Sequence, residues 1–178
     1  MNRQPGLDLE LMSLTFKIRD FFSPRKNILE EAGIKKGFHV LDYGCGPGSY
    51  IIPLAEIIGK SGKIYALDVN PFAIRKVKNI VSKKHLKNVE TICSDCETGL
   101  PDESMDMILL YDTLHDLNEP EKVLRELHRV LKSNGILSLS DHHMKENEIV
   151  NAVTGRGLFK LLKKGKKTYN FSKRKNDR

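Results

Sequence analysis

The 178-residue sequence has no apolar run long enough to cross a membrane. A membrane-spanning helix needs about 18 or more consecutive apolar residues, and no segment approaches that length. The N-terminal stretch MNRQPGLDLE also lacks the apolar core of a secretory signal. These absences argue against a membrane span and lead us to expect a cytoplasmic protein.

Cysteine is scarce, with only Cys45, Cys93 and Cys96 in the whole chain. An odd number of cysteines cannot all pair, and without a secretory signal we expect reduced thiols. The fold must therefore be stabilised by its hydrophobic core. The chain length suits one domain with a core of useful size.

The net charge of +7 is concentrated at one end of the chain. Residues 160–178 hold nine Lys or Arg and one Asp, whereas the rest of the chain is close to neutral. Like charges at a chain end usually remain solvated, although they also suit nucleic acid or an anionic membrane. We expect a neutral body followed by a basic tail at 173–178. RNA contact by this basic segment is an alternative.

Apolar, partly β-branched runs alternate with helical patterns from residue 38 onward. This alternation predicts an α/β fold with a doubly wound, mainly parallel sheet and helices on both faces. Ligands of such sheets bind at the carboxyl ends of the strands. The expected strands are 38–43, 63–68, 89–94, 105–111 and 135–141, followed by an antiparallel hairpin of 158–163 and 167–172; the expected helices are 49–59, 70–84, 119–131 and 145–154.

Residues 1–36 do not follow this alternation. They predict one or two helices interrupted near Ser23-Pro24, with Phe16, Ile18, Phe21 and Phe22 as apolar anchors. We expect this segment to be a helical flap or packing element beside the cofactor edge. The alternative is that it only covers the edge of the sheet. The catalytic domain is expected at 37–172.

A glycine-rich loop follows the first expected strand and contains the most specific motif. Dinucleotide-binding folds use G-x-G-x-x-G, but here Ser49 stands three positions after Gly46. An acid, Asp42, precedes the loop. A carboxylate there repels a pyrophosphate and attracts an ammonium or a sulfonium group, so the loop favours a cationic cofactor. The expected contacts from this loop are Asp42, Gly44, Cys45, Gly46 and Gly48.

Further polar residues follow the next two expected strands. Asp68 can accept hydrogen bonds from both hydroxyls of a ribose, as acids do in other nucleoside-binding sheets. Asp95 and the backbone of Cys96 stand where an adenine ring would bind, although a turn role is the alternative for Asp95. The neighbours Val69, Asn70 and Tyr111 complete the expected cofactor contacts.

The set V-L-D-Y-G-C-G-P-G, A-L-D-V-N and C-S-D-C resembles class I S-adenosylmethionine-dependent methyltransferases. It is most similar to the small enzymes related to ubiquinone and menaquinone biosynthesis C-methyltransferases. The resemblance implies a Rossmann-like, seven-stranded sheet of order 3-2-1-4-5-7-6 with strand 7 antiparallel. It also implies that the glycine loop faces the methionine end of S-adenosylmethionine, Asp68 the ribose, and Asp95 and Cys96 the adenine. The quinone enzymes are longer, so their substrate does not carry over.

Methyl transfer mainly requires positioning of the acceptor, and a general base is optional. Candidate bases follow the fourth and fifth expected strands: Tyr111, Asp112, His115, His142 and His143. His115 is the first choice because its pKa range suits proton transfer near neutrality. Capping of the next helix is its alternative role, and Asp112 can instead line the cofactor.

Other functions have weaker support in the sequence. Zinc binds to residue types such as those of Cys93, Cys96 and the pair His142-His143. The sequence has no second C-x-x-C, however, and we expect no metal. A further alternative is a soft methyl acceptor of the arsenic type, which the thiols of the three cysteines would bind if they converge. Enzymes of this fold that methylate the amino groups of nucleic-acid bases carry Asn or Asp, then Pro-Pro and an aromatic residue, after the fourth strand. The corresponding segment here, Tyr111-Asp112-Thr113-Leu114, lacks this motif. We therefore favour a small-molecule acceptor over nucleic acid. A non-catalytic S-adenosylmethionine-binding module is also an alternative, and the oligomeric state is not predicted.

Overall fold

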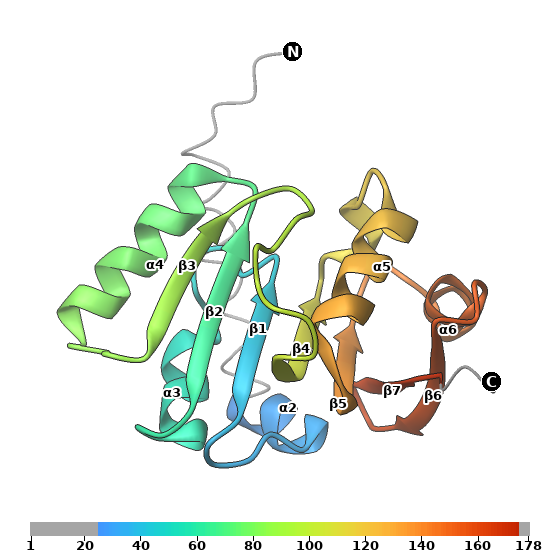
Figure 1. Cartoon of the computed structure of the whole chain (residues 1–178), viewed down its shortest axis with the longest axis horizontal. Helices are drawn as coiled ribbons and strands as arrows, with labels where there is room; N and C mark the ends of the chain where they lie inside the picture. Colours follow the sequence, from blue (N-terminus) through green and yellow to red (C-terminus); the bar gives the residue numbers. More distant parts are fainter. Residues whose placement is uncertain (1–24, 175–178) are drawn as a thin grey trace.

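Seven strands form one sheet in the order β3-β2-β1-β4-β5-β7-β6 (Figure 1). The computed structural model describes residues 25–174, and the expectations for 1–24 and 175–178 lie outside them. Strands β1 to β5 pair in parallel, and β7 is antiparallel to both β5 and β6. The strands are β1 His39–Tyr43, β2 Lys63–Asp68, β3 Val89–Cys93, β4 Met105–Tyr111, β5 Leu131–Ser140, β6 Phe159–Lys164 and β7 Tyr169–Lys173. The predicted fold class and strand order are confirmed.

Helices cover both faces of this sheet. They are α2 Arg25–Ala32, α3 Ile51–Ile58, α4 Pro71–Lys83, α5 Pro120–Val130 and α6 Glu146–Thr154, with a short 3₁₀ turn, η1, at Leu114–Asp116. The side chains of α2, α3 and α4 belong to one buried cluster, and those of α5 and α6 belong to another. Along β1, Val40 joins the first cluster and Leu41 the second, as the alternation of a strand requires.

The start of α4 follows directly from its sequence. The Asn70 side chain accepts a hydrogen bond from the Phe72 backbone N–H, and Pro71 occupies the first turn, where its missing N–H has no cost. The expected helix and cap are confirmed. One face of α4 is buried through Ala73, Ile74 and Val77.

The boundary between α5 and β5 differs from the prediction. The sequence pattern predicts a helix as far as Leu131 and a strand from Gly135, and that boundary is wrong. Leu131 is buried and pairs with Met105, after which the register shifts before Met107 pairs with Ile136. Pairing with β4 therefore overrides the helical pattern of the local sequence.

The C-terminal hairpin forms as expected, with its β7 strand placed between β5 and β6. Lys173 lies within β7, and the Arg174 backbone N–H donates to Leu158 O at 2.9 Å. The sheet thus extends into the first residues of the segment expected as a tail. Within residues 25–174, no helix is both long and apolar enough to cross a membrane.

Candidate functional site

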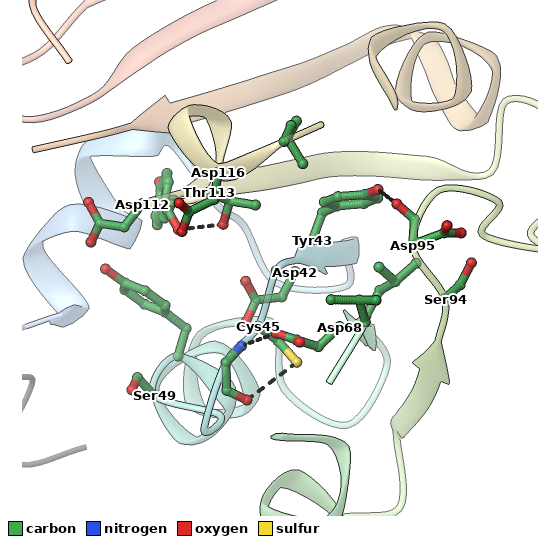
Figure 2. Close-up of a pocket in the computed structure, with 17 residues that line it drawn as sticks. Asp42, Tyr43, Cys45, Ser49, Asp68, Ser94, Asp95, Asp112, Thr113 and Asp116 are labelled. Carbon is green, nitrogen blue, oxygen red and sulfur yellow. Dashed lines mark hydrogen bonds between the residues drawn. The ribbon is translucent and has the colours of Figure 1, made fainter. Parts of the chain in front are cut away.

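A cavity of about 290 Å³, the first cavity, lies at the carboxyl ends of the central strands (Figure 2). Its walls come from the loop after β1, the end of β2, and the segments after β3 and β4. In Figure 2, Asp112, Thr113 and Asp116 lie on one side, and Ser94 and Asp95 lie on the opposite side. The lining consists of Asp42, Tyr43, Gly44, Cys45, Gly46, Ser49, Tyr50, Leu67, Asp68, Val69, Ser94, Asp95, Tyr111, Asp112, Thr113, Asp116 and Leu117.

The glycine loop is held tightly against β2 and β4. The backbone N–H groups of Gly44 and Cys45 both donate to Leu67 O, at 2.8 and 2.9 Å. Gly44 has φ +76°, and a Cβ added there would lie 2.3 Å from Thr113 Oγ1. No other residue fits this position without displacing its neighbours.

Gly48 has a different role from the other loop glycines. It has φ +82°, and a Cβ there would approach Val77 and Ile80 of α4 at 3.0 Å. It lies outside the lining of the first cavity. Gly48 therefore allows the loop to pack against α4.

Asp42 is the most unusual group in the first cavity. Its side chain is buried, and Oδ2 accepts no hydrogen bond from the described residues. Burial raises the pKa of Asp42 to about 7, repulsion from Asp68 adds to this, and Arg25 partly offsets both. A buried carboxylate without a hydrogen-bond donor is costly, and a neighbouring cation is the kind of group that would stabilise its charged form.

Asp68 at the end of β2 already accepts two backbone hydrogen bonds. Its Oδ2 accepts from Gly46 N–H and its Oδ1 accepts from Asn70 N–H, both at 2.8 Å. Each carboxylate oxygen accepts more than one hydrogen bond, so capacity for a ligand hydroxyl remains. Asn70 itself caps α4 and lies outside the lining.

The two residues expected at the adenine edge are separated by the structure. Asp95 lines the first cavity, and its backbone carbonyl accepts from the Tyr43 hydroxyl at 2.9 Å (Figure 2). Cys96 is buried in the core cluster of α5, and its N–H donates to Ser94 Oγ at 3.4 Å. Val69 lines the cavity and is 65% exposed, which places it at the rim.

Most of the residues expected around a cofactor therefore meet at one cavity, while Gly48, Asn70 and Cys96 do not reach it. The sequence interpretation missed several lining residues: Tyr43, Ser49, Tyr50, Leu67, Ser94, Thr113, Asp116 and Leu117. Tyr43, Leu67, Ser94 and Thr113 lie at or within two residues of the end of a strand, whereas the other four lie in the segments that follow β1 and β4. Position after a strand is a usable signal for the first group, and the second group depends on how the loops fold.

A second cavity of about 330 Å³ adjoins the first, because Tyr50 and Asp112 line both. It lies between the ends of β4 and β5, helix α2, and the turn of the C-terminal hairpin. Its other lining residues are Ile28, Ser140, Asp141, His142, Lys166, Lys167 and Tyr169.

Two histidine–carboxylate pairs stand beside the second cavity. His142 Nδ1 lies 2.5 Å from Asp112 Oδ1, and Asp112 has φ +50°, an uncommon backbone conformation for a residue other than glycine. His115 Nδ1 lies 2.8 Å from Asp141 Oδ2. His142 lines the second cavity. His115 is in neither lining, but it contacts Asp141 of the second cavity and, through Nε2 at 3.5 Å, Asp116 of the first. Within 25–174, no group of three or more His, Cys, Asp or Glu is arranged to hold a metal ion.

A carboxylate of α2 holds the hairpin turn in place. Glu31 Oε1 accepts from the Lys167 N–H, the Thr168 N–H and the Thr168 hydroxyl, each at 2.8 Å. Burial alone would raise the pKa of Glu31, but these hydrogen bonds together lower it. A Cβ at Gly165 would lie 2.2 Å from Glu31 Oε1, so this contact needs glycine. Glu31 therefore joins the two walls of the second cavity that come from α2 and the turn.

The family model described as a methyltransferase domain matches residues 34–176. The chain belongs to this methyltransferase family. The chain is 34% identical over 138 residues to a demethylmenaquinone methyltransferase of Listeria monocytogenes, covering 77% of this chain and 57% of the relative. It is 31% identical over 126 residues to the enzyme of that name from Geobacillus stearothermophilus, covering 70% of this chain and 54% of the relative. The chain thus spans little more than half the length of these relatives.

A solved structure of a SAM-dependent methyltransferase from Aquifex aeolicus has a similar fold over nearly the full length of both chains. The TM-score is 0.81 at 28% sequence identity, and the match covers 96% of this chain and 98% of that one. Together with the family match and the strand order, this similarity confirms the predicted resemblance to class I methyltransferases.

Proposed function

We propose that this methyltransferase-family chain binds S-adenosylmethionine in the first cavity and transfers its methyl group to a small-molecule acceptor. The observation that carries the proposal is the buried, unpartnered Asp42 oxygen beside the glycine loop. A dinucleotide would bring a pyrophosphate to this acid, whereas S-adenosylmethionine brings an ammonium and a sulfonium. The similarity to a solved SAM-dependent methyltransferase from Aquifex aeolicus supports the same cofactor.

The proposed cofactor contacts follow the order of the strands. Asp42 and the loop Gly44–Gly46 would hold the methionine end, Asp68 the ribose, and Asp95 the adenine edge. Val69 and Tyr111 also line the cavity. For Gly48, Asn70 and Cys96 we propose indirect roles, because they shape the loop, the start of α4 and the core behind the cavity.

S-adenosylmethionine supplies an already activated methyl group, so the protein's task is to hold an acceptor nucleophile in line with it. We propose that the acceptor binds in the second cavity, which shares Tyr50 and Asp112 with the first. Where the acceptor must lose a proton, we assign that role to His142, oriented by Asp112 through the 2.5 Å contact. His115 remains a second candidate base, and it contacts the wall of the second cavity through Asp141.

Calorimetry with S-adenosylmethionine and NAD tests the cofactor assignment. We expect saturable binding of S-adenosylmethionine only, and Asp68→Ala should weaken it by more than about ten-fold because a ribose contact and the loop contact to Gly46 are both lost. Glu90→Gln is the matched control, since Glu90 pairs with Lys63 outside the cavity. Saturable binding of NAD without binding of S-adenosylmethionine would refute the proposal.

A further inference from the structure

Two acids and two histidines join the ends of β4 and β5 in a reciprocal arrangement. Asp112 directly follows β4 and contacts His142, which lies after β5. Asp141 directly follows β5 and contacts His115, which lies after β4. We propose that this arrangement holds His142 with its proton on Nδ1, so that Nε2 is the atom that takes a proton from the methyl acceptor. Asp141 and His115 are then positioning residues. This inference rests on the proposed function and decides between its two candidate bases.

Each acid contacts its histidine at two points. Asp112 Oδ1 accepts the backbone N–H of His142 at 3.2 Å and lies 2.5 Å from its ring Nδ1. Asp141 Oδ2 accepts the backbone N–H of His115 at 3.3 Å and lies 2.8 Å from its ring Nδ1. An ionised carboxylate can only accept, so the ring nitrogen beside it must donate, and the other nitrogen of a neutral imidazole is then an acceptor. Both rings therefore carry their proton on Nδ1.

The two Nε2 atoms have different surroundings. Nε2 of His142 forms no hydrogen bond to another residue of the described range 25–174, and His142 lines the second cavity. Nε2 of His115 lies 3.5 Å from Asp116 Oδ2, and His115 belongs to neither cavity lining. A nitrogen directed at a second carboxylate is poorly placed to take a proton from an acceptor. His142 is therefore the base, and His115 holds its own segment in place.

His143 connects the two pairs. Its ring packs against the ring of His142 with 3.9 Å between centroids and against that of His115 with 4.3 Å. Its backbone N–H donates to Asp141 Oδ1 at 3.0 Å, and Asp141 is buried. Asp141 thus fixes the residue that packs against His142, and this contact limits rotation of the His142 ring. A base that is already oriented needs less rearrangement to reach the acceptor.

The proton transfer can be written from this geometry. Nε2 of His142 takes the proton of the acceptor atom, and the electron pair of the broken bond stays on the acceptor atom. The ring then carries protons on both nitrogens, and its Nδ1–H remains bonded to Asp112, whose charge stabilises the imidazolium. The His142 side chain is 57% exposed, so Nε2 can release this proton to water and return to its starting state.

NMR spectroscopy of the ring nitrogens tests the position of the proton without acceptor or cofactor. Spectra of the isotope-labelled full chain at alkaline pH, where imidazole is neutral, distinguish a protonated ring nitrogen from an unprotonated one. We expect His142 to show the Nδ1–H form alone. The exposed His85, whose ring has no hydrogen bond to residues 25–174, provides the reference mixture of both forms in the same spectrum. Asp112→Gly should return His142 to this mixture, because glycine adopts the φ of +50° without strain and removes the carboxylate.

Two further variants complete the test. Asp112→Asn keeps an acceptor oxygen and should retain part of the preference, so it serves where the glycine variant does not fold. Asp141→Asn should remove the Nδ1–H form of His115 and reduce that of His142 by a smaller amount. Asp102→Asn is the control, because Asp102 pairs with Arg129 outside both cavity linings, and it should change neither ring.

The inference is overturned if wild-type His142 carries its proton on Nε2, or if the Asp112 variants leave its form unchanged, as the Asp102 control should. An unchanged His142 spectrum in Asp141→Asn would remove Asp141 from the positioning residues. The proposed function fails separately, because it requires S-adenosylmethionine to bind in calorimetry, and the NMR measurement uses no cofactor.

Discussion

The two cavities are built in contrasting ways. The first is formed by a contiguous loop and by residues directly after parallel strands, with the buried Asp42 near its centre. The second is assembled from α2, the ends of β4 and β5, and the hairpin turn, which lie far apart in the sequence. The comparison indicates that the proposed cofactor site is formed mainly by the sheet and the loops that follow its strands, whereas the proposed acceptor site depends on how separate segments dock.

The largest expected effect concerns the stability cost of Asp42. Its pKa in the folded protein is raised to about 7, so the folded state binds more protons than the unfolded state between about pH 4 and 7. Stability should therefore fall as pH rises through this window, by an amount on the order of a few kcal/mol. The slope should be largely absent in Asp42→Asn and retained in Glu90→Gln. Urea unfolding across this pH range measures the slope of stability against pH. Equal slopes in wild type and Asp42→Asn would contradict the raised pKa of Asp42.

A smaller effect is expected from crowding the glycine loop of the first cavity. Gly44→Ala adds a methyl group at a positive φ and against Thr113, so it should cost about 2–3 kcal/mol of stability or shift the loop. Gly99→Ala is the matched control, because Gly99 has φ +66° with no atom within 4 Å of the added Cβ. It should cost only about 1 kcal/mol from backbone strain. Thermal unfolding of both variants separates the stability cost of the close contact with Thr113 from the cost of backbone strain at positive φ.

The smallest effect concerns the second cavity. Glu31→Gln removes a charged acceptor of three hydrogen bonds and should cost about 1–2 kcal/mol of stability near neutral pH. Because the folded pKa of Glu31 is lowered, its contribution is present above the unfolded pKa and is lost as pH falls through the folded pKa. The difference from wild type should therefore shrink in acid. Glu30→Gln, an exposed neighbour on α2, should show no such difference in the same denaturant titrations.

Cofactor affinity sharpens the comparison further. Glu31→Gln should leave S-adenosylmethionine binding almost unchanged, because Glu31 is outside the lining of the first cavity. Its effect should appear in the stability of the protein and not in the affinity for the cofactor. A loss of cofactor affinity in this variant would mean that the two cavities are not independent.

The sequence predicted the doubly wound sheet because alternating strand and helix patterns with short connections allow few topologies, whereas the strand order was implied by the resemblance to class I methyltransferases. It predicted the first cavity nearly as well, since carboxyl ends of neighbouring parallel strands meet at one edge. The failure at Leu131 had a tertiary cause, because its pairing with Met105 and the following register shift leave no trace in local periodicity.

The acceptor side was harder to predict for the same physical reason. His115 and His142 both follow strand ends, but of the two it is His142 that lines the second cavity, where its backbone N–H and its ring both contact Asp112 Oδ1. Nothing in the local pattern of Glu31 or Gly165 indicates that α2 binds the hairpin turn. Such contacts join residues more than 130 positions apart, as for Glu31 and Thr168, and they emerge only from the folded chain.

The central claim, that Asp42 makes the first cavity a site for a cationic cofactor, is tested most directly by the calorimetric affinity for S-adenosylmethionine. We predict that wild-type affinity increases as pH rises through about 7, where Asp42 loses its proton. Asp42→Asn should bind about ten-fold or more weakly and lose this pH dependence, because a charged hydrogen bond is removed. An Asp42→Asn protein that binds S-adenosylmethionine with wild-type affinity and wild-type pH dependence would contradict the claim.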